Sequence, residues 1–336
     1  MKTTEEREDI ELIATLPYQW DIIKNKTILI SGGTGFIGSF LIDVIRYRNE
    51  HFASNTHIIS MSRHGGVSDD TVTSMVADVT KPIDLKTNVD FVLHLASNTH
   101  PKQYASDPIG TILTNIIGCD NLLKLAVDHH ATRFLLASSV EIYGEGSIEP
   151  MDEYYCGYID CNNARAGYNE SKRTCEALVQ AYRDSCGIDA VIIRLARTFG
   201  PDAKRDTKAI SQFFEKAIND EDIILKSKGN QRYSYIYVAD AASGILKVLL
   251  DGKNGEAYNV AADYDNHTLK EYAEMIAGFA GRKVVVACEE NSSVSKAVNA
   301  IMKCDKIKDI GWKSCYTVSN AMERTYKIYK TRHICK

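Results

Sequence analysis

The chain lacks any uninterrupted apolar run that approaches the roughly 18 residues of a membrane-spanning helix. Its acidic first 17 residues have neither the basic start nor the apolar run of a secretory signal peptide. No block of basic residues occurs, and the charges that sum to a net −4 are mixed along the chain. We therefore expect no membrane partner and no nucleic-acid partner.

Cysteines with metal-binding or redox spacing are also missing. The nine cysteines are odd in number and scattered, and none forms Cys-x-x-Cys. Cys156 and Cys161 have no histidine or further cysteine nearby that would complete a metal site. These features predict free thiols in a reducing, cytoplasmic setting and no bound metal.

Short apolar runs recur along the first 200 residues of this 336-residue chain. Those predicted to be strands are residues 26–31, 57–62, 74–78, 89–96, 134–138 and 190–194. Helical periodicity lies between them, most clearly over 109–127 and 167–185, and residues 5–16 form a further amphipathic segment. Continuous apolar strands that alternate with helices are typical of an α/β protein with a doubly wound parallel sheet, the Rossmann arrangement.

A glycine triplet separates the first predicted strand from the helix that follows it. Gly32, Gly35 and Gly38 have the spacing Gly-x-x-Gly-x-x-Gly. The first glycine permits a tight turn, the second lets backbone N–H groups approach a pyrophosphate, and the third allows close contact between helix and strand. In this strand–turn–helix setting the triplet predicts dinucleotide binding.

The sequence becomes richer in charge after Gly200-Pro201, where only residues 235–238 and 257–260 look like strands. We predict two closely joined parts. The dinucleotide-binding Rossmann domain comprises residues 1–200 and 233–262, and a smaller α/β substrate-binding lobe comprises residues 201–232 and 263–336.

The end of the second predicted strand bears on which dinucleotide binds. An Asp or Glu there would favour NAD, but the chain has Ser62-Arg63-His64. Arg63 could meet the 2′-phosphate of NADP, stack on the adenine or point to solvent. The cofactor is thus NAD or NADP, with NADP slightly favoured by Arg63. Asp78 is placed either to accept from the adenine amino group or to cap a turn.

Tyr168 and Lys172 are spaced i,i+4 in a predicted helix, so both side chains lie on one helix face. A nearby ammonium favours the anionic form of a tyrosine and lowers its pKa. Such a tyrosine can act as general acid and base for a substrate hydroxyl next to a hydride-transfer site.

Together these motifs resemble the extended short-chain dehydrogenase/reductase superfamily, and within it the enzymes that act on nucleotide-activated sugars. The matching segments cover most of the chain: residues 32–38, 78–79, 94–97, 114–118, 138–144, 168–172, 194–201, 233–240 and 311–312. The resemblance implies a cofactor site formed by Gly32, Gly35, Phe36, Ile37, Gly38, Arg63, Asp78, Val79, Leu95, Ala96, Ser97, Asn115, Tyr168 and Lys172. It also implies a homodimer in which helices 109–127 and 167–185 of two copies form a four-helix bundle.

In that family the third catalytic residue is a Ser or Thr five positions before the glycine of a Tyr-Gly pair, and here it is Ser139. Glu141 is two residues further, and on an extended segment both side chains would face the sugar. The family's dehydratases have an Asp before this Glu, where the chain has Val140. The UDP-glucuronate decarboxylases keep the Glu without the Asp, and the surroundings of Ser139 and Tyr168 look most like theirs.

The resemblance implies chemistry through a transient 4-ketone. Tyr168 would take the proton of the sugar C4 hydroxyl, the cofactor would take the hydride, and Lys172 would bind the nicotinamide ribose. Decarboxylation, epimerisation or dehydration then becomes accessible in a redox-neutral cycle. The alternative is net reduction of a keto sugar or nucleotide-linked ketose by NADPH. A non-catalytic sensor or scaffold is disfavoured by the intact Ser139, Tyr168 and Lys172.

The substrate-binding positions depart from the family. Arg197 stands where members often have Asn, Tyr233 where they have a diphosphate-binding Arg, and Asn299 where a second phosphate Arg is expected. The predicted substrate-binding cations are therefore Arg197, Arg205 and Arg232, with Lys204 and Lys208 as further candidates. We expect an anionic small-molecule substrate, nucleotide-linked or otherwise phosphorylated.

Overall fold

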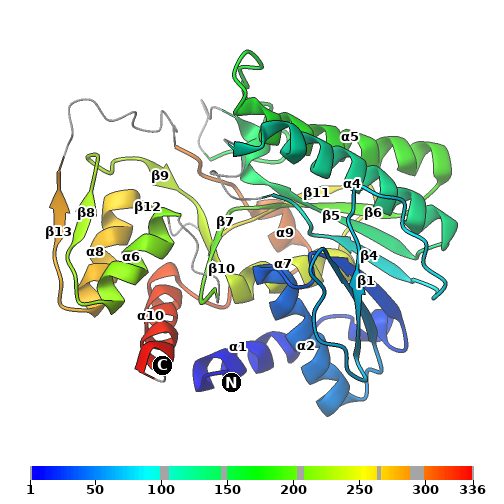
Figure 1. The fold of residues 1–336 in the computed structure, drawn as a ribbon, viewed down its shortest axis with the longest axis horizontal. Helices are drawn as coiled ribbons and strands as arrows, with labels where there is room; N and C mark the ends of the chain where they lie inside the picture. Colours follow the sequence, from blue (N-terminus) through cyan, green and yellow to red (C-terminus); the bar gives the residue numbers. More distant parts are fainter. Residues whose placement is uncertain are drawn as a thin grey trace.

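Seven parallel strands form the central sheet of the computed structural model, which describes residues 2–98, 106–144, 150–202, 208–262, 266–287 and 299–334. The strand order is β3–β2–β1–β4–β5–β6–β11 (Figure 1), and every pairing is parallel. The strands are β1 (Thr27–Ser31), β2 (His57–Ser62), β3 (Val72–Val76), β4 (Phe91–His94), β5 (Arg133–Ser139), β6 (Ala190–Leu195) and β11 (Ala257–Val260). The predicted doubly wound α/β sheet is confirmed.

Two predicted strands have the wrong ends. β3 starts and finishes two residues before the predicted 74–78, because Val72 is the buried residue that pairs with Ile58. Asp78 consequently lies beyond the strand. β4 is shorter than the predicted 89–96, since the chain leaves the sheet after His94.

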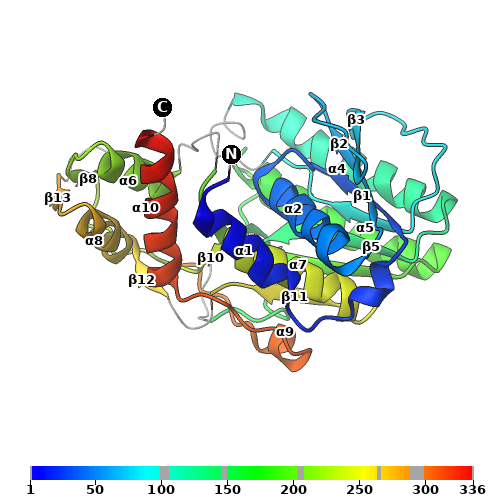
Figure 2. The ribbon, with the colours of Figure 1, turned by 90° about the horizontal axis from the view of Figure 1, so that it is seen from below.

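Side chains of β1 alternate between two helical layers. Ile28 and Ile30 pack in one core with α1 (Thr4–Ala14), α2 (Phe36–Phe52) and α7 (Val238–Asp251). Leu29 packs in the other core with α4 (Pro108–Asp128) and α5 (Ala166–Cys186). Figures 1 and 2 show α4 and α5 side by side on one face of the sheet, with α1, α2 and α7 on the other. Both faces are covered, which is why the strand runs are continuously apolar.

The strand order reverses between β1 and β4, which are neighbours in the sheet. Their connections leave towards opposite sides, and in such sheets a crevice for ligands opens beyond the carboxyl ends of the two strands. The segments that leave here are the glycine turn after β1 and residues Leu95–Ser97 after β4.

Short elements follow Leu195 and gather at one end of the sheet, on the left of Figure 1. They are β7 (Arg197–Phe199), α6 (Ala209–Ile218), β8 (Ile223–Leu225), β9 (Arg232–Tyr233), β10 (Tyr235–Tyr237), β12 (His267–Thr268), α8 (Leu269–Phe279), β13 (Val284–Val286) and α10 (Val318–Ile334), with α9 (Asp305–Asp309) contacting β11. Three two-stranded sheets pair β10 with β7, β12 with β9 and β13 with β8.

The expectation of only two strands after Gly200 is wrong. β8, β9, β12 and β13 have two or three residues each, too few for an alternating pattern to be recognised. β11 joins the central sheet as expected, but β10 pairs with β7 outside it. The division into two domains stays a prediction.

The N-terminal amphipathic segment forms α1 and is joined to the C-terminal part by a buried carboxylate. Asp9 accepts hydrogen bonds from the hydroxyls of Tyr237 and Tyr316, both at 2.6 Å, and from Arg324 Nε at 2.9 Å. Burial raises the pKa of Asp9, although these donors oppose the shift. The bonds hold α1 beside α10 (Figure 2).

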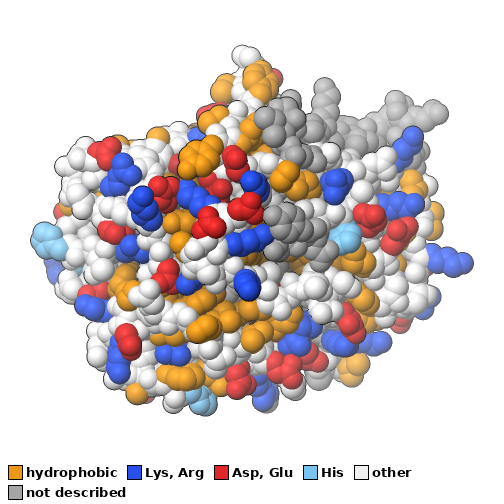
Figure 3. All heavy atoms as spheres, turned by 180° about the vertical axis from the view of Figure 1, so that it is seen from behind, with side chains coloured by type: hydrophobic (Ala, Val, Ile, Leu, Met, Phe, Trp, Pro, Cys, Tyr) orange, Lys and Arg blue, Asp and Glu red, His pale blue; other side chains and the backbone are white. Residues whose placement is uncertain are grey.

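Within the described ranges, no helix is both long and apolar enough to cross a membrane. The same residues hold no group of three or more His, Cys, Asp and Glu side chains suited to a metal ion. Acidic and basic side chains are interspersed over the face drawn in Figure 3.

Candidate active site

The turn between β1 and α2 has no room for side chains at two of its glycines. Gly32 has a φ of +76°, a left-handed backbone that favours glycine, and a Cβ there would lie 3.0 Å from the Ala96 amide nitrogen. A Cβ on Gly38 would collide with the Gly32 carbonyl oxygen. Helix α2 therefore starts directly against the end of β1, with Gly35 as its N-cap. N–H groups in a first helical turn have no intrahelical partner and can bind a pyrophosphate, so this backbone fits a dinucleotide.

A cavity of about 1060 Å³ opens beside this turn, at the carboxyl ends of β1, β4 and β5. Most of the predicted site residues are in its wall: Gly32, Gly35, Phe36, Ile37, Gly38, Leu95, Ala96, Ser97, Ser139, Glu141, Tyr168, Lys172 and Arg197. Its size slightly exceeds the roughly 300–1,000 Å³ typical of small-molecule sites. A dinucleotide and a second small molecule can thus be accommodated side by side.

Ser139, Tyr168 and Lys172 lie together in this wall. Ser139 is the last residue of β5, while Tyr168 and Lys172 are in the first two turns of α5 and are 5% and 3% exposed. Lys172 Nζ donates a hydrogen bond to the Ala137 carbonyl oxygen at 2.9 Å. Burial lowers the pKa of Lys172. A cation fixed one turn from Tyr168 favours the phenolate, the form in which tyrosine acts as a base.

Glu141 is not on an extended segment, contrary to the prediction. β5 ends at Ser139, and the 3₁₀ helix η2 (Val140–Tyr143) follows because Ser139 Oγ accepts the Glu141 N–H at 3.2 Å and caps it. Glu141 Oε1 in turn accepts a hydrogen bond from Arg197 Nη2 at 3.1 Å. The predicted catalytic carboxylate and a predicted substrate-binding cation are therefore an ion pair in the cavity wall.

Other predicted site residues are not in this wall: Arg63, Asp78, Val79, Asn115 and Arg232. Arg205 and Lys204 lie outside the described residues. Asn115 is fully buried behind the wall, where it accepts a hydrogen bond from Ser97 Oγ at 2.7 Å and donates one to Ser171 Oγ at 2.8 Å. It therefore joins the segment after β4 to helix α5.

Arg63 and Asp78 are exposed and follow the adjacent strands β2 and β3. Asp78 Oδ1 accepts hydrogen bonds from the amide and the hydroxyl of Thr80, both at 2.9 Å. These bonds, with a smaller contribution from the charge of Arg63, lower the pKa of Asp78. Asp78 thus caps a turn, one of the two roles left open by the sequence, and its contact with adenine stays a prediction.

Val79 and Arg232 lie outside the cavity wall and contact other segments of the chain. Val79 is buried, and a Cβ on Gly118 of α4 would lie 2.8 Å from its Cγ2 atom, so it packs directly on that helix. Arg232 is exposed on β9, with Nη2 3.4 Å from the Asn266 carbonyl oxygen, and the cavity wall contains its neighbour Tyr233 instead.

The family model described as "NAD dependent epimerase/dehydratase family" matches residues 28–261. The chain belongs to the NAD dependent epimerase/dehydratase family. The resemblance inferred from its motifs is thereby confirmed.

Relatives and solved structures agree with this membership. UDP-glucuronic acid decarboxylase 3 of Arabidopsis thaliana is 32% identical over 273 residues, which cover 80% of this chain and 78% of the relative. UDP-glucuronic acid decarboxylase 1 of Xenopus tropicalis is 27% identical over 311 residues, with coverages of 91% and 72%.

Among solved structures, UDP-glucose 4-epimerase of Thermotoga maritima with UDP-glucose has a TM-score of 0.78 at 19% identity, covering 92% of this chain and 100% of its own. A dTDP-glucose 4,6-dehydratase of Streptomyces venezuelae with NAD bound has a TM-score of 0.77 at 20% identity, covering 92% and 98%. These two likenesses show a shared fold.

Several members of the wall were missed by the sequence reasoning: Arg165, Asn169, Thr198, Tyr233 and Tyr235. Asn169 Nδ2 donates a hydrogen bond to the Glu141 carbonyl oxygen at 2.8 Å. Its position next to Tyr168, and that of Arg165 at the start of α5, were available signals. Tyr233 stands at the position where the family has a diphosphate-binding Arg, which was a signal for it, and both Tyr233 and Tyr235 reach the cavity from strands of only two and three residues.

His94 fixes the wall segment after β4. Its Nδ1 atom lies 2.8 Å from Ser31 Oγ, which also accepts the Ala96 N–H at 3.2 Å. Burial, and secondarily the charge of Lys172, lower the pKa of His94 to about 3. The ring is therefore neutral at physiological pH and acts as a structural support.

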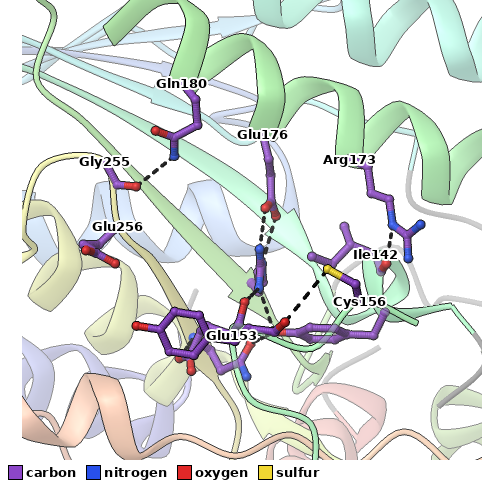
Figure 4. A network of polar contacts seen from close by, with 12 residues as sticks. Ile142, Glu153, Cys156, Arg173, Glu176, Gln180, Gly255 and Glu256 are labelled. Atoms are coloured by element: carbon purple, nitrogen blue, oxygen red, sulfur yellow. Dashed lines mark hydrogen bonds and ion pairs between the residues drawn. The ribbon is translucent and has the colours of Figure 1, made fainter. Parts of the chain in front are cut away.

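Arg194 of β6 holds helix α5 in place behind the cavity wall. Its Nε and Nη2 atoms donate to Glu176 at 3.1 and 2.7 Å, and Nη1 donates to the Glu153 carbonyl oxygen at 2.7 Å. Figure 4 shows Glu176 reaching from α5 into this network, while Gln180 of the same helix donates a hydrogen bond to the Gly255 carbonyl oxygen. Glu176 follows Lys172 by one turn, so the ion pair fixes the rotation of the helix that carries Tyr168 and Lys172.

Proposed function

We propose that this enzyme converts a nucleotide-activated sugar through a transient 4-ketone, and that its reaction is the decarboxylation of UDP-glucuronate. The observation that supports this most is the meeting of Ser139, Tyr168 and Lys172 with the glycine turn in one cavity. The relatives named UDP-glucuronic acid decarboxylases support the choice of substrate.

In the proposed reaction Tyr168 removes the proton of the sugar C4 hydroxyl, and Ser139 holds that oxygen by a hydrogen bond. Lys172 favours the phenolate of Tyr168 and binds the cofactor ribose. A nicotinamide dinucleotide held at the glycine turn would accept the C4 hydride and later return it.

The 4-ketone is β to the carboxylate on C5. The bond from C5 to the carboxylate carbon breaks, carbon dioxide leaves, and the electron pair moves onto the ketone oxygen until C5 takes up a proton. Tyr168 finally gives its proton back to the C4 oxygen. Decarboxylation is favoured over dehydration because Val140, where the dehydratases have an acid, cannot protonate a leaving hydroxyl.

We take NAD as the cofactor, held by the glycine turn and by Leu95, Ala96 and Ser97. The second candidate is an NADPH-dependent reductase of a keto sugar or nucleotide-linked ketose. It is favoured by one observation, the exposed Arg63 at the end of β2 in place of an acidic residue.

The proposal includes a homodimer built on α4 and α5. Ile109, Leu113 and Ile117 follow one another at i,i+4 spacing on α4 and are 71%, 47% and 36% exposed. The small Ala177 and Ala181 are exposed on the neighbouring α5. Such a face, apolar on one helix and small on the other, suits a four-helix bundle with a second copy.

We also propose the two-domain division, with residues 1–200 and 233–262 for the dinucleotide and residues 201–232 and 263–336 for the substrate. A cytoplasmic location is part of the same proposal. It is supported by the cysteines of the described ranges, all seven of which are free.

Incubation with UDP-glucuronate and NAD, followed by chromatography of the nucleotide sugars, tests the proposal. We expect a UDP-pentose and carbon dioxide. Tyr168→Phe should lower turnover by about 100- to 10,000-fold while cofactor affinity stays nearly unchanged. Oxidation of NADPH by a keto sugar, with UDP-glucuronate left intact, would support the reductase instead.

A further inference from the structure

Arg197 is held on two sides at the cavity wall. Its Nη2 atom donates to Glu141 Oε1 at 3.1 Å, and the centre of its guanidinium lies 4.0 Å from the ring centroid of Tyr233. The ion pair and the cation–π contact orient the planar group in advance of any ligand. Arg197 occupies a position where the family often has an uncharged Asn, so it places a positive charge there that an Asn would not.

The other terminal nitrogen of Arg197, Nη1, is buried and has no hydrogen-bond partner among the described residues. A buried cationic N–H without an acceptor is unfavourable, and native structures seldom retain one without a reason. Arg197 is in the cavity wall, although Nη1 itself has almost no accessible surface, so a small shift of the side chain on binding would bring this donor to an acceptor on the bound molecule.

Glu141 connects Arg197 to the reacting end of the cavity. Its N–H donates to Ser139 Oγ at 3.2 Å, and its carbonyl oxygen accepts from Asn169, the residue after Tyr168, at 2.8 Å. The guanidinium is thus linked through Glu141 to Ser139, one of the residues that would hold the reacting sugar oxygen. This location favours a group on the sugar ring over the diphosphate of the nucleotide.

The charges of the wall favour an anion. Four cationic side chains, Arg165, Lys172, Arg197 and Lys208, face two carboxylates, Glu141 and Asp202. Glu141 engages one side of the Arg197 guanidinium, which leaves its other side for a second carboxylate, since the planar group carries five N–H donors.

We infer that Nη1 of Arg197 binds the carboxylate of a hexuronate ring, so that Arg197 selects acidic sugars. The inference rests on the proposed function and adds the residue that recognises the acid. Glu141 is then a positioning residue for Arg197, in addition to any contact of its own with the sugar. A phosphate of the nucleotide offers the same anionic oxygen chemistry, and the experiment separates the two sources.

The test compares two ligands that differ only in the carboxylate. Calorimetric titration of the NAD-loaded protein with UDP-glucuronate and with UDP-xylose gives both affinities for the wild-type Arg197, Arg197→Met and Arg197→Lys, each carrying Tyr168→Phe so that UDP-glucuronate is not turned over during the titration. Arg197→Met should weaken UDP-glucuronate binding by roughly 10- to 100-fold and leave UDP-xylose binding within about twofold. Arg197→Lys keeps the charge but loses the forked geometry, so its affinity for UDP-glucuronate should lie between those of wild type and Arg197→Met.

The ratio of the two affinities is insensitive to partial misfolding, because both ligands would lose affinity together. Arg282→Met, an exposed arginine paired with Asp220, is the matched control and should leave both affinities at wild-type values. Equal losses for both ligands in an Arg197→Met variant that still binds NAD with wild-type affinity would assign the donor to the diphosphate and overturn the inference, with the proposed function intact. Failure of the wild-type protein to bind either nucleotide sugar would overturn both.

Discussion

Lys172 donates a hydrogen bond from its buried ammonium to the carbonyl oxygen of Ala137, near the end of strand β5. The bond joins helix α5 to the strand that ends in Ser139, so the two elements that carry the proposed catalytic groups are held together at one point. A buried ammonium with a fixed direction is an electrostatic element as well as a structural one, because it lies one helical turn from Tyr168.

Replacement of this ammonium should move the pH dependence of catalysis. In Lys172→Met the phenolate of Tyr168 loses its cation, so the pKa of Tyr168 should rise. The rising limb of kcat/KM against pH should then shift to higher pH, with a large loss of turnover at neutral pH. A variant that is merely slower, with an unmoved pH profile, would show that Lys172 does not tune Tyr168.

Arg63 tests the choice of dinucleotide. If it meets a 2′-phosphate, Arg63→Ala should weaken NADP(H) binding by roughly 10- to 100-fold and leave NAD binding unchanged, as measured by fluorescence titration of the reduced cofactors. The neighbouring His64→Ala variant is the control and should behave like wild type. An unchanged NADP(H) affinity in Arg63→Ala would remove the main support for the reductase alternative.

His94 should make the fold sensitive to mild acid. Its pKa of about 3 is below the ordinary value of 6.5, so the folded state binds fewer protons than the unfolded state between these values. The stabilising effect is complete above pH 6.5 and is lost as the pH falls towards 3. Between pH 7 and pH 5 the free energy of unfolding should drop by about 2 kcal/mol on this account.

Urea unfolding of wild type and His94→Asn at the two pH values checks the size of this effect. His94→Asn should have a lower free energy of unfolding than wild type at pH 7. Between pH 7 and pH 5 its free energy of unfolding should fall by less than that of wild type, because the contribution of His94 is absent. His51→Asn, at an exposed histidine of α2, should keep the wild-type dependence. Equal losses in wild type and His94→Asn would contradict the assignment.

The proposed dimer predicts the effect of one charge on α4. Leu113→Glu places a carboxylate in the middle of the exposed apolar stripe, so the dimer should dissociate into monomers at micromolar concentration, as measured by sedimentation velocity. Val67→Glu is a fair control because Val67 is more exposed, at 79%, and lies far from α4 in the sequence. A dimer that survives Leu113→Glu would place the interface elsewhere.

The parts of the site that depend on local backbone geometry could be predicted from the sequence. Gly32 needs a left-handed φ, Gly38 needs the absence of a side chain, and the spacing of Tyr168 and Lys172 puts both on one helix face. These requirements restrict which residue types can occupy the positions, so they can be recognised in the sequence. Six strands of the central sheet could be predicted because they are buried on both faces, whereas the edge strand β3, of which only Val72 is buried, was placed two residues too late.

The rest depends on contacts between distant segments. Arg197 and Glu141 are 56 positions apart, and their pairing follows from how β7 is placed beside η2, for which no periodic pattern exists. The change from an extended segment to a 3₁₀ turn at Val140 depends on the hydroxyl of Ser139 as a cap. Tyr233 reaches the cavity from a strand of two residues, too short to be read from alternation.

The central claim is a redox-neutral cycle on an acidic nucleotide sugar. Its most direct test is a reaction with a large excess of UDP-glucuronate, labelled with ¹³C at the carboxylate, over NAD. The account predicts release of labelled carbon dioxide and formation of a UDP-pentose over many turnovers per NAD, without accumulation of reduced cofactor. Retention of the label in the sugar, or product capped at one equivalent per cofactor, would contradict it.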